Sequence, residues 1–168
     1  MADPHRNAAI YYADDGYSPE KKGVNGRRVA GASFLKGFFR HADVDEFISL
    51  TQGPNGAASF AALYASATDR KLPHRPVYNG APLKMRPVET LYFPSPNFGA
   101  ECWKRQRFGM ASHAICGITH TTATQAVMRG LLDLRTAPQA PWDAIICTSR
   151  AVHAATLRNI ELADEHLL

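Results

Sequence analysis

Short apolar runs alternate with amphipathic segments along this chain, and this alternation restricts the fold more than any other feature of the sequence. Each apolar run has the length of one strand and is followed by polar or turn-forming residues. Buried strands are predicted at residues 8–13, 45–51, 114–119 and 142–148. Apolar residues at helical spacing predict helices at 26–42, 55–67, 97–110, 124–134 and from 150 nearly to 168.

The predicted order of elements indicates an α/β fold. Residues 71–96 contain six prolines and are expected to hold two short strands joined by loops. Strands that alternate with helices favour a mostly parallel sheet. We therefore expect a Rossmann-like, doubly wound sheet with helices on both faces, and the length of 168 residues predicts a single domain over 1–168.

The helix predicted at 97–110 is expected to direct Phe98, Cys102 and Trp103 to one side and its basic residues to the other. Its cluster Lys104-Arg105 with Arg107 is interpreted as a solvated helix face. A second basic group, Lys21-Lys22 with Arg27-Arg28, lies near the first predicted helix.

The net charge of +4 and the isoelectric point near 9.1 come from scattered basic residues. A nucleic-acid partner is not expected, because its footprint would be a denser basic patch, but the short clusters could attract an anionic small ligand. Three cysteines without CxxC spacing are expected to be reduced and mostly buried.

The expected location is cytoplasmic, including peripheral association with the inner face of the membrane. The segment from Met1 to Arg6 has no apolar signal core, and no stretch approaches the roughly 18 apolar residues of a membrane helix.

Polar residues follow several predicted strands. In an open α/β sheet, ligands bind outside the carboxyl ends of the strands, where loops and helix N-termini converge. The residues at these positions that we single out are Asp14, Asp15, His120, Thr121, Ser149 and Arg150. We expect them to lie at one edge of the sheet.

Each of these residues also has a purely structural interpretation. Asp14 and Asp15 either orient hydroxyl groups of an acceptor or form the turn that ends the first strand. His120 either hydrogen-bonds a sugar hydroxyl or a developing charge, or is an ordinary polar residue at a strand end. Ser149 is expected to cap the helix that begins at Arg150 or Ala151, and a capped helix N-terminus can still contact a phosphate or an acceptor.

A glycine-containing loop precedes the first long helix. Gly23, Asn25 and Gly26 stand in the run GVNG, where glycines would let backbone N–H groups approach a diphosphate. The alternative is a loop with Gly26 near a helix cap. The run lacks the spacing of a dinucleotide fingerprint and of a phosphate-binding P-loop, and residues around Ser149 do not form a GxSxG elbow. No histidine, cysteine and aspartate spacing resembles a zinc site, so neither a metal nor another cofactor is expected.

Four motifs, in this order, resemble the N-terminal domain of bacterial GT-B glycosyltransferases of family 4: IYYADDG, KGVNGRRVAGASFLKGFFRH, HAICGITHTTATQAVM and PWDAIICTSRAV. The resemblance covers nearly the whole chain, and its most specific parts are GITHT and WDAIICTSRAV. It implies retaining transfer of a sugar from a nucleotide-sugar donor to a glycan, lipid or small-molecule acceptor, without a required metal, in a cleft between two Rossmann-like domains.

The same resemblance implies roles for individual residues. Residues 23–26 match the loop that approaches the donor diphosphate, and His120 matches a histidine near the transferred sugar. Ser149 and Arg150 match strand-end positions that face the cleft. The N-terminal domain of such enzymes chiefly receives the acceptor.

One feature of that family is missing from these residues. Its C-terminal domain grips the donor through a Glu-x7-Glu motif, and no two glutamates here have that spacing. We therefore expect residues 1–168 to be the acceptor-side half, inactive alone, with a partner donor-binding domain and a possible self-association through the face that domain would cover. Two alternatives remain: a non-catalytic α/β binding or scaffolding domain, and an unrelated nucleotide-binding enzyme.

Overall fold

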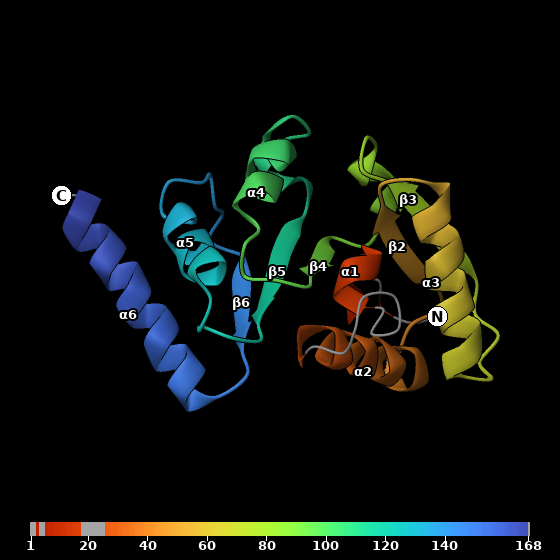
Figure 1. Ribbon diagram of the computed structural model, residues 1–168. Coiled ribbons are helices and arrows are strands. Elements are labelled where there is room, and N and C mark those ends of the chain that lie inside the picture. Colours follow the sequence, from red (N-terminus) through yellow and green to blue (C-terminus); the bar gives the residue numbers. More distant parts are fainter. Residues whose placement is uncertain (1–2, 4–5, 18–25, 168) are drawn as a thin grey trace. The chain divides into compact units, whose positions relative to one another are not determined.

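The computed structural model describes residues 3, 6–17 and 26–167, and the chain divides into two compact units, Met1–Pro94 and Ser95–Leu168 (Figure 1). We call them unit 1 and unit 2. Every strand pair within each unit is parallel. The α/β class with a parallel, Rossmann-like sheet is therefore confirmed.

Unit 1 contains a parallel sheet in the order β3-β2-β1-β4. Its strands are β1 (Ala9–Tyr11), β2 (Phe47–Thr51), β3 (His74–Tyr78) and β4 (Thr90–Phe93). Its helices are α1 (Asp14–Tyr17), α2 (Gly26–His41), α3 (Pro54–Ala67) and the 3-10 helix η2 (Pro82–Met85). This strand order is that of the first mononucleotide-binding half of a Rossmann fold, with the fourth strand on the far side of the first.

The two faces of the unit 1 sheet are packed differently. On one face, aromatic side chains join the strands to α2 and α3: the rings of Phe39 and Phe47 are 5.1 Å apart, and those of Tyr12 and Phe60 are 5.5 Å apart. On the other face, Met85 at the end of η2 and Val88 pack with apolar residues of all four strands. The segment that connects β3 to β4 through η2 thus covers the second face of the sheet.

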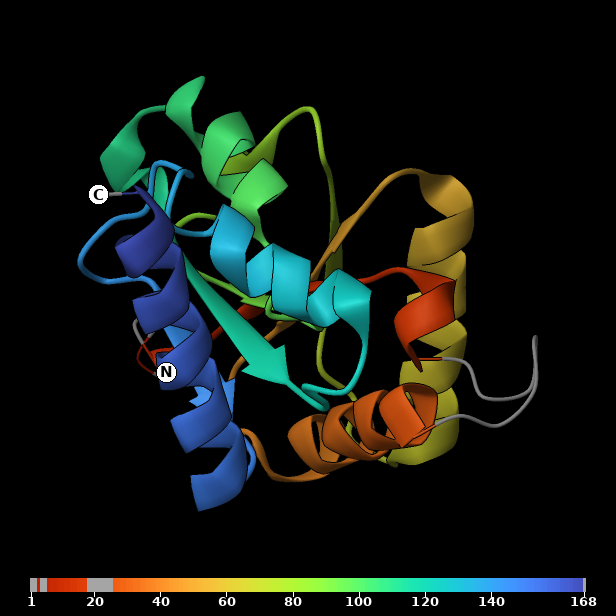
Figure 2. The same ribbon diagram turned by 60° about the vertical axis from the view of Figure 1, so that its left-hand side comes forward.

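The helix α1 occupies residues that the sequence pattern predicts as a turn. Tyr17 anchors it, because its ring is buried, stacks on Tyr12 at 5.2 Å and donates a hydrogen bond from its hydroxyl to the Tyr11 carbonyl at 3.0 Å. Figure 2 shows α1 lying against α2. Gly31 of α2 permits this approach, since a Cβ there would overlap the carbonyl oxygen of Gly16.

Unit 2 contains a parallel strand pair and its helices. They are α4 (Gly99–Gln106), the 3-10 helix η3 (Met110–Ser112), β5 (Ala114–Thr119), α5 (Gln125–Asp133), β6 (Ala144–Cys147) and α6 (Arg150–Leu167). The register pairs Cys116 with Ala144 and Thr119 with Cys147. Each of the long strands and helices predicted from the sequence is present, within a few residues of its expected ends.

Two predictions about burial in unit 2 are wrong. The strand β6 alternates between exposed and half-buried residues, with Ile146 42 % exposed, so it is not the fully buried strand that its apolar run predicts. In α4, Arg105 is buried with Cys102, whereas Trp103 is 56 % exposed. The buried face consists of Phe98, which directly precedes α4, and of Glu101, Cys102 and Arg105 within it, because positions i, i+3, i+4 and i+7 lie on one face of a helix.

The cysteines are free thiols: Cys102 is buried, and Cys116 and Cys147 are half-buried. Burial raises the pKa of the Cys102 thiol to about 11 and also raises that of Cys116. Both thiols are therefore protonated at neutral pH, which makes them poor nucleophiles. Within the described residues, no helix is both long and apolar enough to cross a membrane.

Candidate functional site

The carboxyl ends of β5 and β6 bring four of the predicted site residues to one edge of unit 2. Because Thr119 and Cys147 are register partners in parallel strands, the segments that follow them start side by side. His120 and Thr121 follow β5, and Ser149 and Arg150 follow β6. The sequence prediction that these residues share one edge is therefore met within unit 2.

A hydrogen bond joins the two strand ends. The Thr148 hydroxyl donates to the Thr119 carbonyl at 3.1 Å, which fixes the start of one loop against the start of the other. Both threonines belong to the polar clusters that the sequence places at these strand ends, although neither is among the predicted site residues. The Thr119 hydroxyl oxygen is itself buried and has no hydrogen-bond partner in the described part of the chain.

The loop after β5 is ordered by its own hydroxyl groups. Thr121 accepts a hydrogen bond from the Ala123 N–H at 3.1 Å, and Thr124 caps α5 by accepting from the Val127 N–H at 3.4 Å. His120 and Thr121 are both half-buried. An imidazole in this position is held by a structured loop and retains partial access to solvent.

Ser149 is the N-cap of α6, as predicted from the sequence. Its hydroxyl accepts a hydrogen bond from the Val152 N–H at 3.1 Å, and its carbonyl accepts one from His153 at 2.9 Å. The hydroxyl is therefore engaged with the backbone and is not poised as a nucleophile. Arg150, the first residue of α6, is exposed at the same edge.

In unit 1, the acidic pair follows β1 and begins α1. Asp15 accepts from the Arg27 guanidinium at 2.9 Å, and its carbonyl accepts from Arg28 at 3.1 Å. Asp14 is half-buried. These contacts join the start of α1 to the start of α2, so the basic residues Arg27 and Arg28 serve an intramolecular role here.

The glycine loop is only partly described. Gly26 is the exposed first residue of α2, and a Cβ at this position would meet no atom within 4 Å. The predicted positions Gly23 and Asn25 lie outside the described residues. The predicted contact of this loop with a diphosphate therefore stays a prediction.

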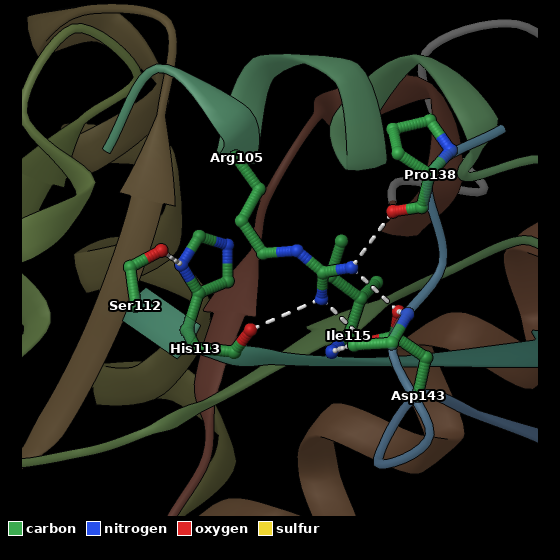
Figure 3. Close-up of polar contacts among 7 residues, drawn as sticks. Arg105, Ser112, His113, Ile115, Pro138 and Asp143 are labelled. Carbon is green, nitrogen blue, oxygen red and sulfur yellow. Dashed lines mark hydrogen bonds and ion pairs between the residues drawn. The ribbon is translucent and has the colours of Figure 1, made fainter. Parts of the chain in front are cut away.

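A buried ion pair lies at the opposite, amino-terminal end of β5 and β6, and sequence reasoning missed it (Figure 3). Arg105 and Asp143 form two parallel hydrogen bonds of 2.5 and 2.7 Å, with side chains 0 % and 2 % exposed. The prediction that Arg105 belongs to a solvated face is wrong. A buried guanidinium must be paired, since an isolated buried charge is too costly.

Both members of this pair also bind backbone groups. Arg105 donates to the carbonyls of His113 and Pro138, at 3.1 and 3.2 Å. Asp143 accepts from the N–H groups of Ile115 and Ala140, each at 2.8 Å. Burial opposes the ionised form of Asp143, but these hydrogen bonds outweigh it and lower the pKa of the carboxyl group. The pair thus joins α4, the start of β5 and the turn before β6.

The neighbouring His113 gives a pH-dependent prediction. Its ring is buried, its Nδ1 lies 3.1 Å from the Ser112 hydroxyl, and burial together with the Arg105 charge lowers its pKa to about 4. As the pH is lowered below about 6.5, His113 becomes protonated in the unfolded chain but stays neutral in the folded chain. The free energy of unfolding therefore decreases as the pH falls from about 6.5 to about 4. The free energy of unfolding, measured with a chemical denaturant, should decrease by on the order of 2 kcal/mol between pH 7 and pH 5 through this residue.

The matched variant for this prediction is His113→Gln. It removes the titrating group, so the part of the pH dependence that comes from residue 113 should disappear. An unchanged slope of stability against pH in this variant would assign the acid sensitivity to other groups.

The described residues contain no group of three or more histidine, cysteine, aspartate or glutamate side chains that could hold a metal ion. The chemistry available at the β5–β6 edge is therefore that of an imidazole, hydroxyl groups, a guanidinium and the N-termini of α5 and α6. Such a set can hydrogen-bond hydroxyl groups and stabilise a developing negative charge. No protein-family model, curated protein or solved structure matches the chain.

Proposed function

We propose that this chain is the acceptor-side half of a retaining glycosyltransferase, which transfers a sugar from a nucleotide-sugar donor to an acceptor. The observation that carries the proposal is the shared edge of β5 and β6, where His120, Thr121, Ser149 and Arg150 gather. The motif resemblance supplies the reaction class, and the parallel β3-β2-β1-β4 order of unit 1 agrees with a Rossmann-like half.

In this proposal, His120 lies near the transferred sugar and hydrogen-bonds a hydroxyl group or the charge that develops during transfer. An imidazole suits this role, because it can donate or accept a hydrogen bond near neutral pH. Ser149 keeps the α6 N-terminus formed, and Arg150 adds a positive charge at the same edge. Favourable interaction with an anionic group follows from both features.

In this proposal the donor is bound chiefly by a second domain, because the motif resemblance assigns the donor-binding Glu-x7-Glu pair to such a domain. Calorimetry of the isolated chain with UDP and GDP should therefore give no binding tighter than about 1 mM, equivalent to about −4 kcal/mol. The chain should also show no turnover with sugar nucleotides.

A second titration, with candidate acceptors, tests the acceptor-side assignment directly. Oligosaccharides titrated into ¹⁵N-labelled chain should shift the backbone amides of residues 120–121 and 149–150. Micromolar binding of UDP or GDP by the chain alone would instead favour an independent nucleotide-binding enzyme. Turnover by the isolated chain would contradict the assignment of these residues to the acceptor side.

A further inference from the structure

A pocket of about 530 Å³ opens between α4 and α5 of unit 2, and none of the residues assigned to transfer lines it. Its volume lies within the range of roughly 300–1,000 Å³ that is usual for small-molecule sites. Small residues leave the space between the two helices unfilled. They are Gly99, Ala100, Ala126, Gly130 and Ala137.

Trp103 lines this pocket and is 56 % exposed. Its neighbours in α4, Cys102 and Arg105, are buried, so the helix is anchored without the indole. An exposed tryptophan presents a large apolar face and a single N–H donor. Beside a cavity, this combination suits a ligand that has an apolar face and polar edges.

Residues with hydrogen-bond donors and acceptors line the same pocket. Asn97 donates from Nδ2 to the Ala126 carbonyl at 3.0 Å, while its buried Oδ1 has no hydrogen-bond partner in the described part of the chain. Gly130 leaves room for this side chain, because a Cβ at position 130 would overlap the Asn97 amide group. Asn97 is thus held against α5 at the wall of the pocket.

Arg129 and Asp133 line the pocket one turn apart on α5. No ion pair within 4 Å joins them to each other or to any other described residue. The Arg129 guanidinium supplies hydrogen-bond donors and the Asp133 carboxylate supplies acceptors, and the sum of their charges is zero. The charges of Arg129 and Asp133 oppose each other, so neither an anionic nor a cationic ligand gains a net attraction from the two side chains.

We propose that the α4–α5 pocket binds a neutral, hydroxyl-rich carbohydrate, with the C–H face of a sugar ring against Trp103. Sugar hydroxyl groups both donate and accept, so one ring can donate to Asp133 and accept from Arg129. The proposal does not depend on transferase activity, because only the pocket carries it. If both proposals hold, the pocket is a second contact for a glycan, separate from the β5–β6 edge.

The experiment follows the indole N–H signals of ¹⁵N-labelled chain in NMR spectra. Maltotriose, mannotriose and chitotriose are added up to about 10 mM, which is high enough to saturate a site with a dissociation constant of about 1 mM. We expect at least one trisaccharide to shift the Trp103 signal saturably. In Trp103→Ala, binding is read from the backbone amides of Asn97 and Gly130 and should be weakened at least about tenfold; Asp133→Asn should weaken it several-fold. The control is Trp142→Ala, because Trp142 is similarly exposed but does not line the pocket.

Other probes distinguish the remaining outcomes. His120→Ala should leave the Trp103 response unchanged, so a failure of the transferase proposal would not remove this one. The inference is overturned if none of the trisaccharides shifts the Trp103 signal. It is also overturned if inorganic phosphate or uridine saturates the pocket while the trisaccharides do not.

Discussion

Under the proposed function, replacing His120 with alanine should lower the kcat of sugar transfer by about 100-fold, equivalent to about 2.7 kcal/mol of barrier. This is the size of effect seen when a preorganised donor is removed from a developing charge. The loop that carries His120 is held by Thr121 and Thr124, and neither contact requires the imidazole. These two contacts should therefore persist in the variant.

Two variants separate the chemical role of His120 from a structural one. His120→Gln keeps a side-chain hydrogen-bond donor and should retain more activity than His120→Ala. His153→Ala removes an exposed histidine of α6 and should leave kcat unchanged. If KM rises while kcat is unaffected in His120→Ala, the side chain contributes to binding alone, and its proposed role near the reacting sugar is wrong.

Much of the fold follows from local patterns in the sequence. The continuous apolar runs at β1 and β5, the helical spacing in α2 and the alanine-rich composition of α3 are local signals, so these elements are predicted to within a few residues. Ser149 was identified as a cap because a hydroxyl residue directly precedes a helical pattern. The strand-end residues at the β5–β6 edge follow from the same reasoning, since parallel strands end at one edge.

The features that were missed depend on contacts between residues far apart in the sequence. Arg105 and Asp143 are separated by 38 positions, and the basic cluster around Arg105 does not indicate that this residue pairs with a buried carboxylate. The exposure of Trp103 depends on which of two adjacent faces of a short helix packs inward. Likewise, α1 forms where a turn is predicted because Tyr17 finds a buried site against Tyr11 and Tyr12.

The Arg105–Asp143 pair should be worth more to folding than any exposed ion pair of unit 2. Arg105→Met should cost about 3–5 kcal/mol in the free energy of unfolding, because it leaves the Asp143 carboxylate buried without its countercharge. Asp143→Asn should also destabilise, since the Arg105 guanidinium then stays buried and charged. Urea unfolding measures the loss of stability, and hydrogen exchange of the β5 and β6 amides shows whether that loss occurs in unit 2.

The matched control is Arg135→Met, which breaks the Arg135–Asp164 pair, whose two side chains are each 41 % exposed. Exposed pairs contribute about 0–1 kcal/mol, so this variant should be nearly neutral. The double variant Arg105→Met with Asp143→Asn should cost less than the sum of the two single variants, because neither charge is then left alone. Additive losses would show that the backbone hydrogen bonds of each side chain, rather than the charge pairing, hold α4 to the two strands.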